Sequence, residues 1–126
     1  MITKIAFFAQ PTKNMSDMRR FYGETLGLAL TGDYGDMWAE FDTPDGKSVA
    51  LDPHSAQQPD ASPYVALETD DIDAEVENLK SHGATIAKDV WANEHEGKLI
   101  CKMAVVIDPD GNPIMLHQIA DWRAQG

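Results

Sequence analysis

The sequence predicts an α+β fold built from two consecutive βαβββ modules, and three internal repeats carry this prediction. The turn segment TPDGKSVALDP at 43–53 returns as DPDGNPIMLHQ at 108–118. The helix-like segment DMRRFYGETLG at 17–27 returns as DAEVENLKSHG at 73–83. Each helix-like segment follows a short apolar run typical of a strand. Because the three repeats occur in the same order, they indicate a duplicated supersecondary unit.

The first module begins with a strand over 2–9. A helix over 15–26 follows, with Asn14 as a plausible N-cap and Gly27 as its stop signal. Three further runs with strand patterning complete the module, at 28–33, 37–42 and 47–52.

The second module begins with a strand over 63–69 and a helix over 72–82, which Asp70 or Asp71 can cap. The helix carries an apolar stripe, and three strands follow at 85–92, 99–107 and 113–119. We expect one domain over 1–126, with module 1 at about 1–52, a proline-rich linker at 53–62 and module 2 at about 63–120.

Composition narrows the class of protein. A chain of 126 residues is the size of one ordinary domain. Its net charge of −11 disfavours nucleic acid and anionic membranes as partners, because both need a basic face. No segment resembles a signal peptide or a membrane span. The single cysteine, Cys101, cannot form an internal disulfide, so we expect a cytoplasmic location.

The second turn predicts a strand register. Asp108-Pro109-Asp110-Gly111-Asn112 fits a type I turn followed by a bulge with left-handed glycine. That loop pairs Asp108 with Asn112, and it sets three pairs further along: Val105 with Met115, Met103 with His117, and Cys101 with Ile119. A two-residue loop would instead turn Lys102 and Ala104 to that face.

With these elements the chain resembles the vicinal oxygen chelate superfamily, which includes glyoxalase I, bleomycin-resistance proteins and extradiol dioxygenases. The segments that carry the resemblance are NMSDMRRFYGETLGL after the first strand, VALETDDIDAEVENLKSHGA and MAVVIDPDGNPIMLHQ. The resemblance implies curved mixed sheets around a cavity, a small organic molecule as partner and a homodimer. It specifies no single reaction.

The metal-using members of this superfamily hold a divalent ion at four positions, on the first and last strand of each module. In this sequence the matching positions hold Phe7, Ala50, Tyr64 and Met115. None of them is a hard donor, so we predict no cofactor. A divalent metal is disfavoured, although a strand register shifted by one residue would reopen that possibility.

Strand alternation then predicts what lines the cavity. With Val49, Leu51, Ile114 and Leu116 under the helices, the residues between them face the other way. The predicted ligand-binding residues are Phe7, Trp38, Glu40, Ala50, Asp52, Tyr64, Met103, Met115 and His117, with Cys101 in the same polar cluster.

Two of these residues are candidate catalytic groups. His117 suits a general base, or is a partly buried structural histidine. Cys101 suits a nucleophile activated by His117, or is a small buried hydrophobe. Together with Met103 and Met115 they also offer a soft-metal site for Cu(I), although inward methionines usually serve packing. Asp52, beside Pro53, suits a turn cap.

Two functions remain open. The chain is either a small-molecule-binding protein that lacks the usual divalent-metal ligands, or an enzyme of this superfamily. The enzyme would be a lyase or isomerase of glyoxalase type, or dioxygenase-like. It would depend on a metal through ligands placed elsewhere, or work without metal through His117. The sequence leaves open whether the chain is an enzyme.

Overall fold

The computed structural model describes residues 1–58 and 61–124, which divide into two compact units. One unit comprises Met1–Ala6 with Val65–Gly126, and the other is Phe7–Tyr64. Each is described by itself below. Pro59 and Asp60, within the predicted linker, lie outside the described residues.

The order βαβββ occurs twice, as predicted. The elements are β1 (Ile2–Pro11), α1 (Met15–Arg20) with a π-helical turn (Phe21–Thr25), β2 (Ala29–Asp33), β3 (Ala39–Asp42), β4 (Ser48–Asp52), a 3-10 turn (Ser55–Gln57), β5 (Tyr64–Thr69), α2 (Ile72–Ser81), β6 (Thr85–His95), β7 (Lys98–Ile107), β8 (Pro113–Ile119) and α3 (Asp121–Ala124). The π-helical turn, the 3-10 turn and α3 are additions that the sequence did not predict.

Sheet order is the same in the two modules: β2-β3-β4-β1 in one and β6-β7-β8-β5 in the other. In each, the first and last strands pair in parallel and the remaining neighbours pair antiparallel. The α+β fold class with mixed sheets is therefore confirmed.

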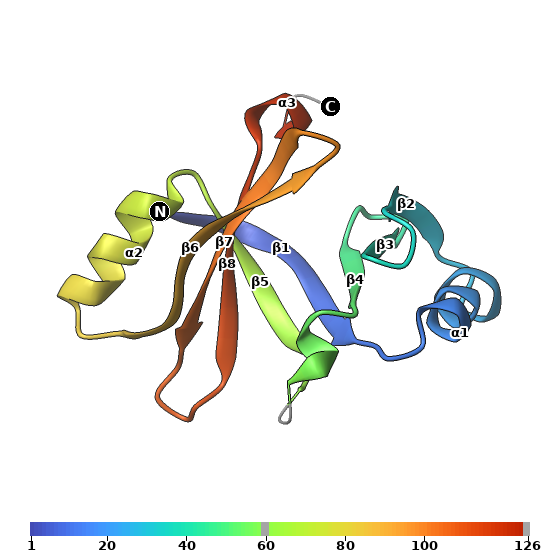
Figure 1. Ribbon diagram of the computed structural model, residues 1–126, viewed down its shortest axis with the longest axis horizontal. Helices are drawn as coiled ribbons and strands as arrows, with labels where there is room; N and C mark the ends of the chain where they lie inside the picture. Colours follow the sequence, from blue (N-terminus) through green and yellow to red (C-terminus); the bar gives the residue numbers. More distant parts are fainter. Residues whose placement is uncertain (59–60, 125–126) are drawn as a thin grey trace. The chain divides into compact units, whose positions relative to one another are not determined.

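One helix covers one sheet face in each unit. Residues of α2 pack on alternate residues of β7 and β8, forming a core of Ile72, Val76, Ala104, Val106 and Leu116. Figure 1 shows α2, in yellow, beside these strands. The smaller core at α1 comprises Met15, Ala39, Phe41 and Leu51. Because side chains alternate along a strand, the residues between these lie on the opposite face.

Both predicted helix starts are present. The Asn14 side chain accepts a hydrogen bond from the Asp17 N–H at 3.2 Å. Of the two candidates for α2, Asp71 is the cap, and it accepts from the Ala74 N–H at 3.1 Å. The first helix widens at its end, where the Leu26 N–H bonds the Phe21 carbonyl five residues back at 2.8 Å.

The predicted bulged turn between β7 and β8 is confirmed. The Asp108 N–H donates to the Asn112 carbonyl and the Gly111 N–H to the Asp108 carbonyl, both at 2.9 Å. Gly111 has a φ of +89°. The register that follows pairs Val105 with Met115, Met103 with His117, and Cys101 with Ile119. The two-residue loop was therefore the wrong alternative.

Candidate functional site

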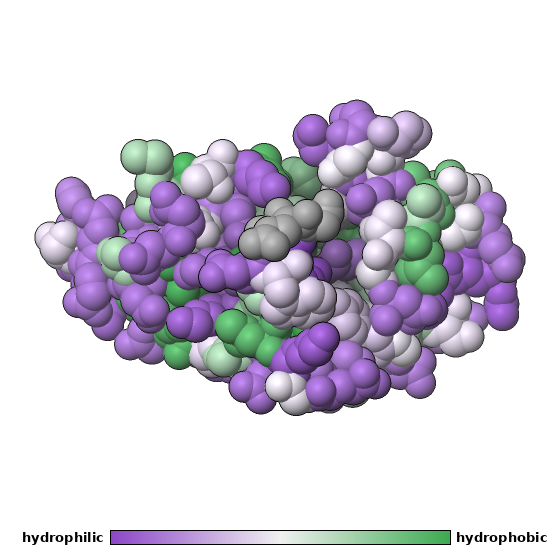
Figure 2. Space-filling model, turned by 90° about the horizontal axis from the view of Figure 1, so that it is seen from above, coloured by the Kyte–Doolittle hydropathy of each residue, from purple (hydrophilic) through white to green (hydrophobic). Residues whose placement is uncertain are grey.

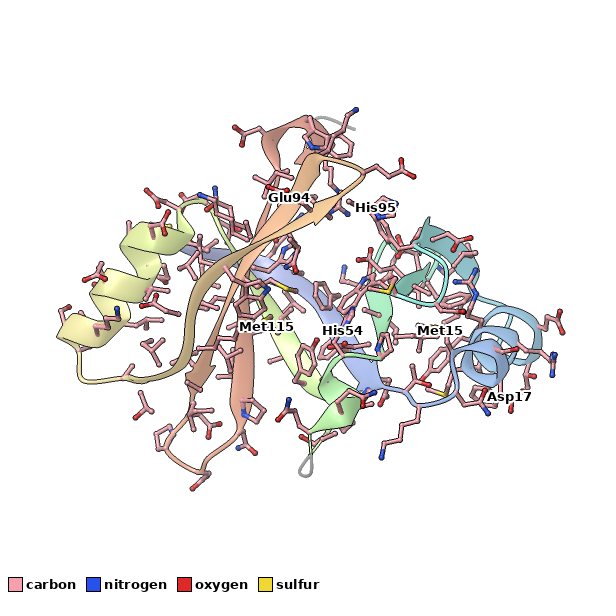
Figure 3. The ribbon with its side chains drawn as sticks, viewed as in Figure 1. Met15, Asp17, His54, Glu94, His95 and Met115 are labelled. Carbon is pink, nitrogen blue, oxygen red and sulfur yellow. The ribbon has the colours of Figure 1, made fainter. Side chains whose placement is uncertain are left out.

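The candidate site lies on the face of β5, β8 and β7 that is turned away from α2. The register aligns residues of the three strands in two rows across this face, and the diagonal position Cys101 extends it. The rows are Ala66–Met115–Val105 and Glu68–His117–Met103. Met115, labelled on β8 in Figure 3, thus lies beside Ala66 and Val105, which are both apolar.

A buried ionisable pair occupies this face. The Nδ1 atom of His117 lies 2.6 Å from Oε1 of Glu68, and both residues are buried. The other carboxylate oxygen of Glu68 accepts from the Ile119 N–H at 2.8 Å. Both oxygens are therefore held, so Glu68 fixes the orientation of the imidazole.

Cys101 extends the pair into a series. Cys101 lies on β7 diagonally across from His117, and it contributes to the raised pKa of the imidazole. The Asn93 side-chain amide on β6 donates to Sγ at 3.5 Å, and the Trp91 indole N–H donates to the Asn93 oxygen at 3.2 Å. Cys101 is buried as well. We call Glu68, His117, Cys101 and Asn93 the polar cluster.

The polar cluster favours a protonated His117. Burial alone lowers the pKa of His117, because it penalises the charged form. The interactions with Cys101 and Glu68 outweigh burial and raise the pKa of His117 to about 9. At neutral pH the ring therefore carries a positive charge and offers a proton, which is the opposite of a neutral general base.

Glu68 and Asn93 were not predicted as site residues. A signal for Glu68 was present, since alternation along YVALET places it on the same face as Tyr64 and Ala66. Asn93 had no such signal, because β6 is displaced by irregularities relative to β7, one of them directly after Asn93.

The other predicted site residues belong to the Phe7–Tyr64 unit. Ala50 pairs with Ala9 and with Glu40, on the sheet face opposite the α1 core. Phe7 and Trp38 meet edge to face, with ring centroids 5.6 Å apart. The Trp38 indole N–H donates to Oε1 of Glu40 at 2.9 Å. These side chains gather on one face of that sheet, where Phe7 and Ala50 are buried and Trp38 and Glu40 are partly exposed.

Asp52 organises the end of β4. Its Oδ1 accepts from the backbone N–H groups of His54 and Ser55 at 2.8 and 3.1 Å. Its Oδ2 accepts from the Tyr64 hydroxyl at 2.5 Å. This is the turn cap that the sequence suggested. Burial, followed by the charge and hydrogen bond of Asp52, raises the pKa of Tyr64, so the phenol keeps its proton.

The four family metal positions do not fit a divalent ion. Phe7, Ala50 and Met115 have no oxygen or nitrogen donor, and the Tyr64 hydroxyl stays protonated and bonded to Asp52. A register shifted by one residue does not repair the set, since the flanking residues are Ala6, Phe8, Val49, Leu51, Pro63, Val65, Ile114 and Leu116. Within residues 1–58 and 61–124, no group of three or more His, Cys, Asp or Glu side chains is arranged to hold a metal.

Two surface hollows, one at the N-terminus and α2 and one at the end of β8, lie elsewhere. One is lined by Met1, Ile2, Ala74, Glu75 and Asn78, and the other by Leu99, Lys102, Gln118, Ile119, Ala120 and Asp121. Neither includes a predicted site residue. His54 and His95 are exposed, as expected, and Figure 3 shows His95 beside Glu94 at the β6–β7 hairpin.

Two βαβββ modules, each with its first and last strands paired in parallel, define the class of proteins built from a duplicated βαβββ unit. The chain belongs to the Glyoxalase/Bleomycin resistance protein/Dioxygenase superfamily, whose family model matches residues 4–116. This confirms the resemblance drawn from the repeated segments.

Solved structures agree on the fold. A superfamily member from Vibrio splendidus 12B01 is 16% identical with a TM-score of 0.69, covering 94% of this chain and 100% of its own. Methylmalonyl-CoA epimerase from Mycobacterium tuberculosis is 17% identical with a TM-score of 0.69, covering 99% and 93%. The Mn(II)-bound glyoxalase from Novosphingobium aromaticivorans is 18% identical with a TM-score of 0.62, covering 96% and 43%. At these identities the likeness shows the fold alone.

No curated protein matches the sequence significantly. Among the described residues, no helix has the length and apolar character needed to cross a membrane.

Proposed function

We propose that the chain binds a small organic molecule on the α2-distal face of β5, β8 and β7, with His117 as the polar anchor. The observation that carries this proposal is the buried polar cluster on an otherwise apolar face. Burying ionisable groups is unfavourable unless they are paired, and well-packed apolar residues often serve stability equally well. A hydrogen-bonded Glu68–His117 pair beside Cys101 therefore suits recognition better than packing.

The chemistry of the face suggests the kind of ligand. Ala66, Met103, Val105 and Met115 supply an apolar wall, and the protonated His117 supplies a charged donor. Such a combination suits a mainly apolar molecule with one carbonyl or carboxylate oxygen. Phe7, Trp38, Glu40, Ala50, Asp52 and Tyr64 keep their proposed ligand-binding role on the other unit, where Asp52 and Tyr64 already bond to each other.

The alternative is an enzyme that works without a divalent metal through His117. The continuous series from Glu68 through His117 to Cys101 favours this version over a metal-dependent one, because the family's four ligand positions lack suitable donors. The Mn(II)-bound glyoxalase and the epimerase therefore share their fold with this chain, and their substrates are not transferred to it.

The broader setting is also part of the proposal. We place a single domain over 1–126 in the cytoplasm, as a homodimer, with no nucleic acid or membrane as partner. The single cysteine supports the location, and the net charge of −11 supports the absence of nucleic acid and membrane partners. The dimer is supported by the frequent dimerisation of superfamily members.

Ligand-observed NMR with a panel of small ketones and carboxylates tests the binding face. Replacing His117→Gln removes a hydrogen bond from a charged donor, so we expect binding of any hit to weaken about tenfold or more. His95→Gln is the matched control, because it changes an exposed histidine on the β6–β7 hairpin. A hit that binds equally well to wild type and His117→Gln would contradict the assignment of the anchor.

A further inference from the structure

Three adjacent strands bring a thiol, an imidazole and a carboxylate together in series. Cys101 lies on β7, His117 on β8 and Glu68 on β5, and Cys101 is the one cysteine of the whole sequence. The arrangement has the form of a nucleophile, a proton-transfer group and an orienting group.

The polar cluster is built to hold its parts in place. Oε1 of Glu68 lies 2.6 Å from Nδ1 of His117, and Oε2 of Glu68 accepts a hydrogen bond from the Ile119 N–H at 2.8 Å. The sulfur of Cys101 receives a hydrogen bond from the Asn93 amide and lies beside the His117 ring. Donors and a neighbouring cation aimed at a sulfur stabilise its anionic form, which is the nucleophile.

The sheet limits the reactions available to this sulfur. Cys101 lies inside a strand that pairs on both sides, with Asn93 on β6 and Ile119 on β8. In paired strands the backbone N–H groups donate to the neighbouring strands. Acyl transfer needs free N–H donors that stabilise an oxyanion. Addition to a conjugated double bond needs only a nucleophile and one proton donor, and the polar cluster supplies both.

We propose that Cys101 adds covalently to α,β-unsaturated carbonyl compounds, with His117 relaying the proton. The sulfur forms a bond to the β-carbon, and the electron pair of the double bond moves toward the carbonyl to give an enolate. The enolate carbon then takes the proton from His117, which is left neutral and regains a proton from water. The product is a thioether, with no leaving group and no change in oxidation state to balance.

This inference names the ligand class for the proposed binding face and rests on that proposal. The carbonyl oxygen would lie toward His117, and the apolar part of the molecule along Met103, Val105 and Met115. Glu68 is a positioning residue here, since it acts through the ring rather than on the ligand.

Intact-mass spectrometry with 2-cyclohexen-1-one tests the addition on the full chain. We expect one adduct on wild type and none on Cys101→Ser, an assignment made simple by the single thiol. At pH 7 the folded protein should react about tenfold or more faster than glutathione, since an activated thiol attacks an electrophile faster than a free thiol does. A rate equal to or below that of glutathione would overturn the proposal, because a merely buried cysteine reacts slowly.

The pH profile separates proton relay from a structural role. Glu68 from β5 and Cys101 from β7 are the titratable groups that shift the pKa of His117, while the Asn93 amide from β6 does not titrate. We expect the wild-type rate to fall above pH 9, where His117 loses its proton. In His117→Gln the rate should be about tenfold lower at pH 7 and rise steadily with pH. In Glu68→Gln the decline should begin at a lower pH, and His95→Gln should match wild type.

An unchanged profile in His117→Gln would overturn the relay, and Glu68→Gln provides the same test should His117→Gln fold poorly. Cyclohexanone, which binds without reacting, distinguishes the two proposals by ligand-observed NMR. Binding of cyclohexanone without any enone adduct overturns the nucleophile and leaves the binding face standing. An enone adduct at a glutathione-like rate, with no cyclohexanone binding, overturns both.

Discussion

The charge of His117 is decided by its immediate neighbours. Burial on its own would keep the ring neutral, but the interactions with Cys101 and Glu68 outweigh it and raise the pKa of His117 to about 9. A residue that looks like a general base in the sequence is therefore an acid at neutral pH. This reverses the proton transfer that the sequence suggested, without moving the residue from the site.

The raised pKa of His117 makes the folded protein sensitive to alkaline pH. The folded state binds this proton more tightly than the unfolded state, whose histidine has a pKa near 6.5. The stabilisation is complete below pH 6.5 and disappears as the pH rises to about 9. We expect urea titrations to show the free energy of unfolding falling across this window, by on the order of 3 kcal/mol at most.

Two variants check that His117 causes this dependence. His117→Gln should flatten the decline between pH 6.5 and pH 9, whereas His95→Gln should keep it, because His95 is exposed and outside the polar cluster. An equally steep decline in His117→Gln would show that another group is responsible.

The site illustrates what the sequence specifies at this scale. Cys101, Met103 and His117 could be assigned to one face because a single turn sets the register of β7 on β8. Glu68, which hydrogen-bonds to His117, was not predicted, since β5 and β8 pair in parallel and no short turn joins them. Parallel neighbours are fixed by packing of the whole unit, and a single sequence does not display that packing.

At the scale of elements, the two Pro-Asp-Gly turns are one structure used twice. In the first, the Thr43 N–H donates to the Lys47 carbonyl and the Gly46 N–H to the Thr43 carbonyl, both at 2.9 Å. The second turn has the same two bonds at the same distances. Gly46 and Gly111 both have positive φ, at 81° and 89°. The repeated letters therefore record a shared backbone requirement rather than a catalytic motif.

This equivalence predicts equal costs of substitution. Gly46→Ala and Gly111→Ala should each destabilise the protein by about 1 kcal/mol, because alanine resists a left-handed conformation. Neither new methyl group meets another atom within 4 Å, so steric clash adds nothing. Urea denaturation measures both variants. Costs that differ by more than twofold would contradict the equivalence.

Element boundaries depended on how local their signals are. The start of α2 at Ile72 follows from the Asp71 cap, a signal within four residues. The end of the first helix agrees with the prediction to within one residue, but Phe21–Thr25 widens into a π-helical turn that leaves no pattern in the sequence. Strand β6 also runs on to His95, three residues beyond the predicted end, since its pairing with β7 continues to Lys98.

Charge is the clearest property of the whole molecule. The face in Figure 2 is covered mostly by hydrophilic side chains with smaller apolar patches. The net charge is −11, and of the buried acidic residues Asp52, Glu68 and Glu75 only Glu68 belongs to the polar cluster. Glu68 is the buried acidic residue of the polar cluster, so the overall charge and the chemistry of the site are separate matters.

Membership of a metal-using superfamily raises a last question for the whole molecule, namely its metal content. The donor chemistry at Phe7, Ala50, Tyr64 and Met115 predicts protein that, after purification and dialysis, holds far less than one Mn, Fe, Ni or Zn ion per chain by elemental analysis. Its melting temperature should not change with EDTA. Met115→Glu restores one carboxylate but no second donor, so it should still take up no Mn²⁺. Stoichiometric metal that a chelator removes, with a fall in melting temperature, would mean that other residues have assumed the role of those four positions.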